Sequence, residues 1–336
     1  MGGNAVFNDL SAHPVSIVCQ DSRDFWRAKI EHLMLTINHV ARRTLWDMSA
    51  GAKPYLAGST KFIFDDFIPT AELVKYKNSF GDIDIQIDVE KGADLMSVLN
   101  LISANECANE FQIVGWQHTV DTIVTMWYDE DVQQTFQVDF ELVEFANDRP
   151  TNWSRFSRSS SWEDTCAGIK GFAHKYIFRA ITAIWLREAQ VQLKTKFVTK
   201  NISPIVFSPK GARVKWREIR PDVWQEIPMD EEALIKNVED LFKLFFKVKP
   251  DAESTCEMYS YQGVVNLILT WIDKEDHLKI AAGMRNLLWG PYAQKLYRDN
   301  PARDFYEKGQ AYLYLTETLG IPVEPFFGSE KYYETY

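Results

Sequence analysis

The pattern of apolar and polar positions predicts a helix near the start of the chain. Across residues 22–48, apolar side chains recur at mostly three- and four-residue spacing with charged side chains between them, as on an amphipathic helix. Gly51 and Pro54 follow this stretch and indicate its end, because neither residue continues a helix well. The segment PYLAGS then predicts a short strand that runs into a turn, and residues 93–109 predict a second helix.

Two later segments show the two-residue period of β-strands. In DIDIQIDV, residues 82–89, acidic or amide side chains alternate with isoleucine and valine, which places Asp82 and Asp84 on one face of the predicted strand. Residues 121–145 predict two strands around the polar turn DEDVQQ, a β-hairpin whose second strand contains Asp139. An isolated charge on an otherwise buried strand is strongly unfavourable unless it is paired or bound to a metal. We therefore expect these aspartates to share a partner.

The strongest break in the pattern is NDRPTNWSRFSRSSS, residues 147–161, which resembles a loop and marks a predicted domain boundary. The predicted domains are residues 1–158 and residues 159–336. In the second domain, residues 163–188 predict one continuous helix and residues 194–227 predict extended chain. Helical patterns dominate from there to Gly320, with breaks near Pro250, Gly290 and Pro301. The predicted fold class is α+β, with strands and helices first and a mainly helical C-terminal domain.

Charge and cysteine content narrow the classes of function. The formal net charge of −10 argues against a surface that binds nucleic acid over its whole extent, although a local basic track remains compatible with it. The 4 cysteines are far apart and form no zinc-binding spacing, which favours reduced thiols in a cytoplasmic setting. Residues 1–20 lack the pattern of a signal peptide, and no long apolar run predicts a membrane span.

The predicted strand spacing suits a metal site. Asp82 and Asp84 would lie roughly 7 Å apart along the strand axis, and two carboxylates this close repel each other unless a cation lies between them. Mg²⁺ prefers one or two carboxylates together with phosphate oxygens of a substrate. Asp139 on a neighbouring strand would let two ions, Mg²⁺ or Mn²⁺, lie roughly 3.5–4 Å apart. Asp88 and Glu141 share these strands, and we interpret them as exposed positions or as groups that support the site.

A turn for phosphate binding precedes these strands. Gly58 follows an apolar stretch and would allow the backbone to approach an anion closely. Ser59 offers a hydroxyl and an N–H group, and a helix beginning after it would add its positive dipole end. The sequence therefore predicts a phosphate site at Gly58 and Ser59.

These motifs together resemble the signature of the DNA polymerase β-like nucleotidyltransferases, hG[GS], then [DE]h[DE]h, then h[DE]h. The matching residues are Gly58 with Ser59, then Asp82 with Asp84, then Asp139, and the resemblance covers about residues 25–190. The superfamily includes poly(A) polymerases, tRNA CCA-adding enzymes and aminoglycoside nucleotidyltransferases, as well as toxin-like members. The resemblance implies a nucleotidyltransferase-type mixed β-sheet core with flanking helices.

The resemblance also implies roles for individual residues. Asp82 and Asp84 would bind both metal ions, and Asp139 would complete the site near the attacking hydroxyl. Gly58 and Ser59 would hold the triphosphate of the nucleotide. Members often carry a lysine on a later helix that contacts the triphosphate.

The candidates for this lysine are Lys170 and Lys175, which could equally be solvated positions on an amphipathic helix. The chain also departs from the family pattern. Residues 60–81 form a longer spacer than is usual, and we interpret residues 60–80 as an insertion or a mobile loop over the site. The arginine–aspartate pair that bacterial CCA-adding enzymes carry after the glycine turn is absent from this sequence.

The acceptor is suggested by a basic segment, residues 194–220, which contains eight lysines and arginines and a single acid. Its SPKG sequence predicts a turn, so the segment could form a hairpin with Arg213, Lys215 and Arg217 on one face. Such a face would suit a polynucleotide backbone. It could equally be an edge strand whose charges discourage aggregation.

The sequence thus predicts an NTP-dependent nucleotidyltransferase that transfers a nucleoside monophosphate to a hydroxyl acceptor and releases pyrophosphate. The first acceptor is an RNA 3′ end such as that of tRNA. A protein side chain or a small molecule is the alternative acceptor. A third hypothesis is a catalytically silent nucleotidyltransferase fold that serves as a binding module.

Overall fold

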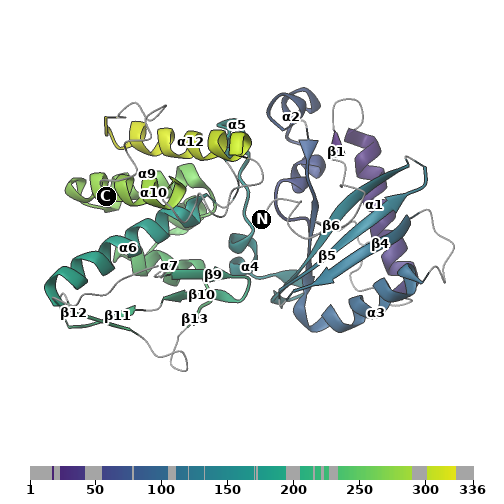
Figure 1. Ribbon diagram of the computed structural model, residues 1–336, viewed down its shortest axis with the longest axis horizontal. Helices are drawn as coiled ribbons and strands as arrows, with labels where there is room; N and C mark the ends of the chain where they lie inside the picture. Colours follow the sequence, from purple (N-terminus) through teal and green to yellow (C-terminus); the bar gives the residue numbers. More distant parts are fainter. Residues whose placement is uncertain are drawn as a thin grey trace. The chain divides into compact units, whose positions relative to one another are not determined.

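The structure is a computed structural model whose course is shown in Figure 1. It describes residues 17–18, 23–41, 55–77, 79–104, 111–119, 121–131, 133–169, 171, 173–193, 205–214, 216–220, 223–226, 234–289 and 301–322. The chain divides into two compact units, Met1–Arg158 and Ser159–Tyr336. Each unit is described by itself.

The first unit contains a four-stranded mixed sheet. Its strand order is β3 (Ile83–Asp88), β6 (Gln134–Val143), β5 (Thr122–Asp129) and β4 (Phe111–His118). β3 runs parallel to β6, and the other pairs are antiparallel, which confirms the expected mixed sheet. β5 and β6 form the predicted hairpin. β4 was not predicted, since a bulge between Ile113 and Gly115 interrupts the alternation of its side chains.

Helices α1 (Arg23–Ala41) and α3 (Gly92–Ser103) pack on one face of this sheet. The indole of Trp26 on α1 contacts the ring of Phe136 on β6, with centroids 6.3 Å apart. A Cβ at Gly92 would meet Leu142, which points to the same side of β6 as Phe136. The opposite face of β6 therefore presents the residues of odd number, among them Asp139. The predicted ends of both helices, 42–48 and 105–109, lie outside the described residues.

The segment between Ser59 and Asp82 is folded. It contains the 3₁₀ helix η1 (Thr60–Phe64), helix α2 (Thr70–Tyr76) and strand β2 (Ser79–Phe80), which pairs with β1 (Ile17–Val18). The guanidinium of Arg23 on α1 donates hydrogen bonds to the carbonyls of Ile63 and Phe62, at 2.8 and 3.3 Å. Most of the apolar side chains of residues 60–80 are buried, among them Phe62, Ile63, Phe64, Ile68 and Leu73, whereas Phe67 is exposed. The interpretation of this segment as a loop is wrong, because it forms these elements and is bonded to α1; its interpretation as an insertion stays a prediction.

Shorter elements complete the first unit. Leu56 forms an isolated antiparallel bridge with Ile85 in place of the predicted short strand. The 3₁₀ helix η2 (Val89–Lys91) follows β3. The predicted loop of residues 147–161 begins with a two-residue pairing of β7 (Phe145–Ala146) with β8 (Arg149–Pro150) and includes helix α4 (Asn152–Ser157). The hydroxyl of Thr151 accepts the N–H of Ser154 and caps α4.

The second unit is mainly helical, as predicted, with two small sheets. Its helices are α5 (Trp162–Cys166), α6 (His174–Leu193), α7 (Val238–Phe246), α8 (Ala252–Glu257), α9 (Tyr261–Trp271), α10 (Lys274–Trp289) and α12 (Pro301–Thr318). One sheet has the order β13 (Leu234–Ile235), β10 (Gly211–Val214) and β9 (Ile205–Ser208), and the other pairs β11 (Trp216–Arg220) with β12 (Val223–Glu226). The predicted turn at SPKG joins β9 to β10.

The helix predicted over residues 163–188 is broken. α5 ends at Cys166, Gly168 has a φ of +71°, and α6 begins at His174. The buried carboxylate of Asp164 on α5 accepts the backbone N–H groups of Tyr261 and Gln262, at 2.7 and 3.1 Å. This contact holds α5 at the start of α9. The left-handed conformation of Gly168 allows the chain to turn between α5 and α6. The apolar period continues on both sides of the break, so it does not reveal the turn.

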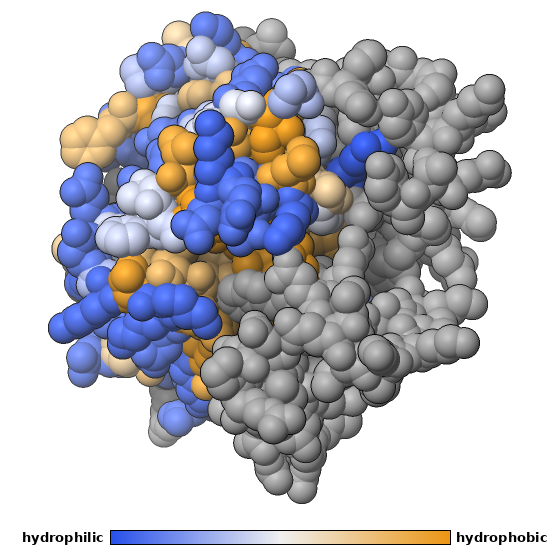
Figure 2. Space-filling model, turned by 90° about the vertical axis from the view of Figure 1, so that its left-hand side faces the viewer, coloured by the Kyte–Doolittle hydropathy of each residue, from blue (hydrophilic) through white to orange (hydrophobic). Residues whose placement is uncertain are grey.

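The core of the second unit contains aromatic side chains among aliphatic ones. The rings of Phe178 on α6 and Phe245 on α7 lie with centroids 4.6 Å apart. Leu269, Trp271 and Leu278 are exposed. Figure 2 shows one side of the molecule, where apolar atoms lie at the surface among hydrophilic ones.

Within the described part of the chain, no helix is long and apolar enough to span a membrane.

Candidate metal centre

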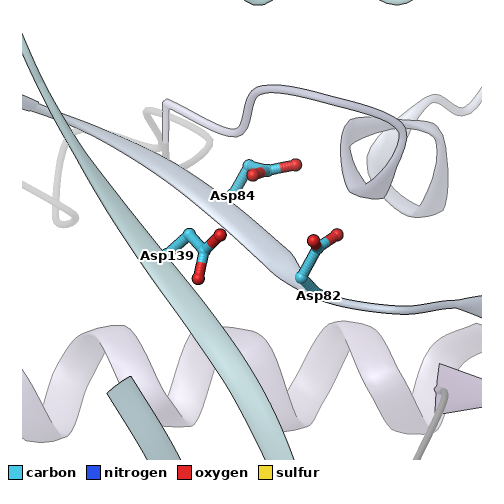
Figure 3. Close-up of side chains that lie close together, drawn as sticks. All are labelled: Asp82, Asp84 and Asp139. Atoms are coloured by element: carbon cyan, nitrogen blue, oxygen red, sulfur yellow. The ribbon is translucent and has the colours of Figure 1, made fainter. Parts of the chain in front are cut away.

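The three predicted aspartates lie together. Asp84 on β3 is in direct register with Asp139 on β6, and Asp82 precedes β3 by one residue. One carboxylate oxygen from each residue lies within 4.8 Å of the other two. Figure 3 shows Asp82 and Asp84 projecting from one stretch of chain toward the same space as Asp139 from its neighbour. Among the described residues, this is the one cluster of three or more metal-ligating side chains.

Local sequence explains why the carboxylates face away from α1 and α3. The apolar residues next to the aspartates are fully buried on the helix-covered side: Ile83, Ile85, Val138 and Phe140. Successive side chains of a strand point to opposite faces, so burial of these apolar groups places the carboxylates on the other face. The parallel register of β3 with β6 then brings Asp84 beside Asp139.

The electrostatics of the cluster indicate an unbalanced negative charge. Desolvation, followed by the charges of Asp82, Glu141 and Asp139, raises the pKa of Asp84 well above its usual value. Desolvation and the charge of Asp82 raise the pKa of Asp139 to about 7. The positive charge of Arg158 opposes both changes. A divalent cation would balance the cluster, and three carboxylates are the hard oxygen donors that Mg²⁺ and Mn²⁺ prefer.

The predicted phosphate turn packs directly on this cluster. Gly58 has a φ of +58°, and a Cβ at this position would lie 2.0 Å from Oδ2 of Asp84. Its N–H donates to the carbonyl of Arg158 at 3.3 Å. Ser59 follows as the residue that precedes η1, and its side chain makes no capping hydrogen bond to that helix. Both the backbone angle and the close approach require glycine here.

Further side chains support the carboxylates. Nε2 of Gln137 donates to Oδ1 of Asp139 at 2.7 Å. Glu141 is buried, so it is not an exposed position; it accepts from Nε2 of Gln86 at 3.4 Å and from Nε of Arg158 at 2.9 Å. The two-residue period marks Gln137 and Gln86 as neighbours of the aspartates on one face. No sequence signal indicates Arg158, because it follows β6 by a helix and a turn.

The two predicted lysines belong to another part of the chain. Lys170 lies outside the described residues. Lys175 is on the first turn of α6, in the second unit, where it is partly exposed. The neighbouring imidazole of His174 is buried, and this desolvation, together with the charge of Lys175, holds the pKa of His174 well below its usual value.

The described residues of the predicted basic face lie on two sheets of the second unit. Arg213 is exposed on β10, which pairs with β9 and β13. Arg217 is on β11, which pairs with β12 in a separate sheet. Lys215 lies outside the described residues. Arg213 and Arg217 therefore do not share a strand, and the common basic face stays a prediction.

Comparisons with known proteins give little further information. No protein-family model matches this sequence, and no curated protein matches it either. A solved structure described as "putative nucleotidyltransferase from H. pylori" matches at 11% sequence identity, over 89% of this chain and 99% of that chain. The TM-score of this match is 0.24. A likeness this low carries no argument, so the proposals below depend on the site itself.

Proposed function

We propose that this protein is a metal-dependent nucleotidyltransferase that transfers a nucleoside monophosphate from an NTP to a hydroxyl acceptor and releases pyrophosphate. One observation carries the proposal. Three carboxylates from two adjacent strands bring oxygens within 4.8 Å of one another, directly against a glycine turn with positive φ. The order of these residues resembles the signature of the DNA polymerase β-like nucleotidyltransferases.

In this proposal, Asp82 and Asp84 hold two Mg²⁺ ions, for which Mn²⁺ could substitute, and Asp139 completes the set. When bound, such ions stabilise the charge that develops on the attacking and leaving oxygens. Gln137 keeps the carboxylate of Asp139 in one orientation through its hydrogen bond of 2.7 Å. Asp139 faces the acceptor hydroxyl from β6.

Gly58 and Ser59 bind the triphosphate. The missing Cβ of Gly58 lets the backbone lie against Asp84, so phosphate bound at the turn would be adjacent to the carboxylates. The hydroxyl of Ser59 makes no capping bond to η1 and serves as a donor to a phosphate oxygen. By the resemblance, Lys170 and Lys175 are further proposed contacts of the triphosphate.

For the acceptor we propose an RNA 3′ end such as that of tRNA. The support is the density of basic residues over 194–220 in a chain of net charge −10. Arg213, Lys215 and Arg217 would contact the backbone at separate points rather than as one strand face. The separation of Arg213 from Arg217 also favours a second candidate, transfer to a protein side chain or a small molecule, which needs no basic track.

Transfer is tested by incubating the protein with radiolabelled NTPs, Mg²⁺ or Mn²⁺, and separate pools of RNA, DNA, protein and small molecules. We expect label in the RNA pool, and none with the Asp82→Ala/Asp84→Ala variant or after chelation of the metal. Asp88→Ala is the matched control, because Asp88 is on the same strand but accepts the N–H of Glu90. Absence of label from every pool would refute the proposal.

A second experiment separates the acceptors. Replacement of Arg213, Lys215 and Arg217 by alanine should abolish labelling of RNA if RNA is the acceptor. Labelling of protein or of small molecules would stay nearly unchanged in the same variant. Calorimetric titration with Mg²⁺–NTP tests the hypothesis of a catalytically silent fold. If the protein binds no nucleotide, the silent fold is favoured over an enzyme.

A further inference from the structure

Arg158 contacts two parts of the candidate metal centre at once. Its backbone carbonyl accepts the N–H of Gly58 at 3.3 Å. Its side chain donates from Nε to Oε1 of Glu141 at 2.9 Å. Arg158 follows α4 directly and is the last residue of the first unit. One residue therefore joins the phosphate turn to the strand that carries Asp139.

Glu141 anchors this arginine firmly. It is 1% exposed and stands two residues after Asp139 on the same face of β6. A buried carboxylate is tolerated only with good partners, and Glu141 has both Arg158 and Gln86. In the pairing of β3 with β6, Gln86 lies opposite Glu141, and Asp84 lies opposite Asp139. The side chain of Arg158 is thus fixed to the two strands that hold the aspartates.

The position of the Gly58 turn depends on this anchor. The turn lies so close to Asp84 that a single added carbon would come 2.0 Å from Oδ2. Two backbone hydrogen bonds hold it there: the N–H of Ala57 donates to the carbonyl of Asp84 at 2.9 Å, and the N–H of Gly58 donates to the carbonyl of Arg158 at 3.3 Å. The ion pair with Glu141 restrains the side chain of the same residue whose carbonyl accepts this bond, and the N–H of Arg158 bonds to the carbonyl of Phe156 at the end of α4. Loss of the ion pair would loosen the turn at Gly58, while the bond of Ala57 to β3 and the aspartates on their strands remain.

We propose that Arg158 and Glu141 form a positioning pair that sets the Gly58–Ser59 turn against the aspartate cluster. The pair determines the affinity for the nucleotide more than the affinity for the divalent cation. This consequence rests on the proposed function, because it takes the turn as the phosphate site. The placement of the turn by the pair does not depend on that function.

The test uses the full chain and four variants: Arg158→Gln, Arg158→Lys, the double variant Arg158→Gln/Glu141→Gln, and Arg155→Gln. Arg155 is the matched control, since it is an exposed arginine of the same helix that bonds locally to Asn152. Calorimetry measures binding of Mn²⁺ alone and of Mg²⁺–ATP. Hydrogen exchange measures protection of the Gly58 amide.

In Arg158→Gln we expect Mg²⁺–ATP to bind about tenfold more weakly, since lost support of a site typically costs 10- to 100-fold. Mn²⁺ affinity should stay close to that of Arg155→Gln, because Arg158 bonds to Glu141 and not to the aspartates, and exchange at Gly58 should accelerate. Arg158→Lys should retain part of the Mg²⁺–ATP affinity and part of the protection of the Gly58 amide, because lysine keeps the positive charge beside Glu141. The double variant leaves no unpaired buried charge, folds, and matches Arg158→Gln, since the two residues act as a unit.

Other outcomes overturn the inference. If nucleotide affinity and Gly58 exchange in Arg158→Gln and in the double variant equal those of Arg155→Gln, the pair does not position the turn. Equal losses of Mn²⁺ and ATP affinity would also overturn it, because the pair would then act on the whole site. If the wild-type protein binds no ATP, the proposed function fails. The exchange rate of the Gly58 amide still decides whether the pair places the turn.

Discussion

Replacement of Gly58 by alanine tests the geometry of the candidate metal centre. The new Cβ would lie 2.0 Å from Oδ2 of Asp84, whereas ordinary contacts begin at 3.4 Å. The two groups must separate by the difference, about 1.4 Å. The clashing atom is at the end of a flexible side chain, so the carboxylate of Asp84 moves more readily than the backbone. The substitution should therefore displace a metal ligand.

Two magnitudes follow for Gly58→Ala. A φ of +58° costs a residue with a Cβ about 1–2 kcal/mol, and the free energy of unfolding should fall by about that amount. Because Mg²⁺ requires ligands at about 2.0–2.1 Å, a carboxylate displaced by more than 1 Å no longer coordinates. We expect Mn²⁺ to bind about 10- to 100-fold more weakly, as for other changes beside metal ligands.

Calorimetry with Mn²⁺ and urea denaturation measure these two quantities. Gly81→Ala is the matched control, since a Cβ at Gly81 meets no atom within 4 Å although this residue directly precedes Asp82. If Gly58→Ala binds Mn²⁺ as tightly as Gly81→Ala does, Asp84 is not a ligand held against this turn. The assignment of the metal centre would then be refuted.

Three further predictions concern single side chains. Gln137→Leu removes the hydrogen bond to Asp139 and should weaken Mn²⁺ binding about tenfold; calorimetric affinity within twofold of wild type would contradict the supporting role. Asp164→Ala leaves two N–H groups at the start of α9 unpaired and should lower the free energy of unfolding by about 1–3 kcal/mol. Urea denaturation measures this quantity, and a change below about 0.5 kcal/mol would contradict the stabilising role of Asp164. Because burial lowers the pKa of His174, the unfolded chain binds a proton below about pH 6.5 that the folded chain does not. Its stabilising contribution is therefore complete above this pH and declines as the pH falls, by up to about 1.4 kcal/mol per pH unit. Denaturation of wild type and His174→Gln between pH 7 and pH 5 should show a shallower slope in the variant, and equal slopes would refute the assignment.

Prediction from sequence was most successful where a local pattern sufficed. Strict alternation in β3 and β6 predicted the strands, and the structure places Asp84 and Asp139 on one face of the sheet as that alternation requires. The helical period over residues 22–48 likewise predicted α1. Prediction failed in residues 60–80, which form η1, α2 and β2 instead of a loop, with the carbonyl of Ile63 bonded to Arg23 on α1. It also failed at Gly168, because the apolar period is the same on both sides of the break.

The amino-acid sequence by itself determined which side chains share a face, because the periods of strands and helices are local properties of the backbone. It thereby placed Asp82 with Asp84 and marked Gly58 as a turn. Only the tertiary structure decided which faces meet. The parallel register of β3 with β6, the contact of Gly58 with Asp84, and the two bonds of Arg158 all join residues far apart in the chain. Such contacts depend on how whole elements pack, and no short stretch of sequence specifies them.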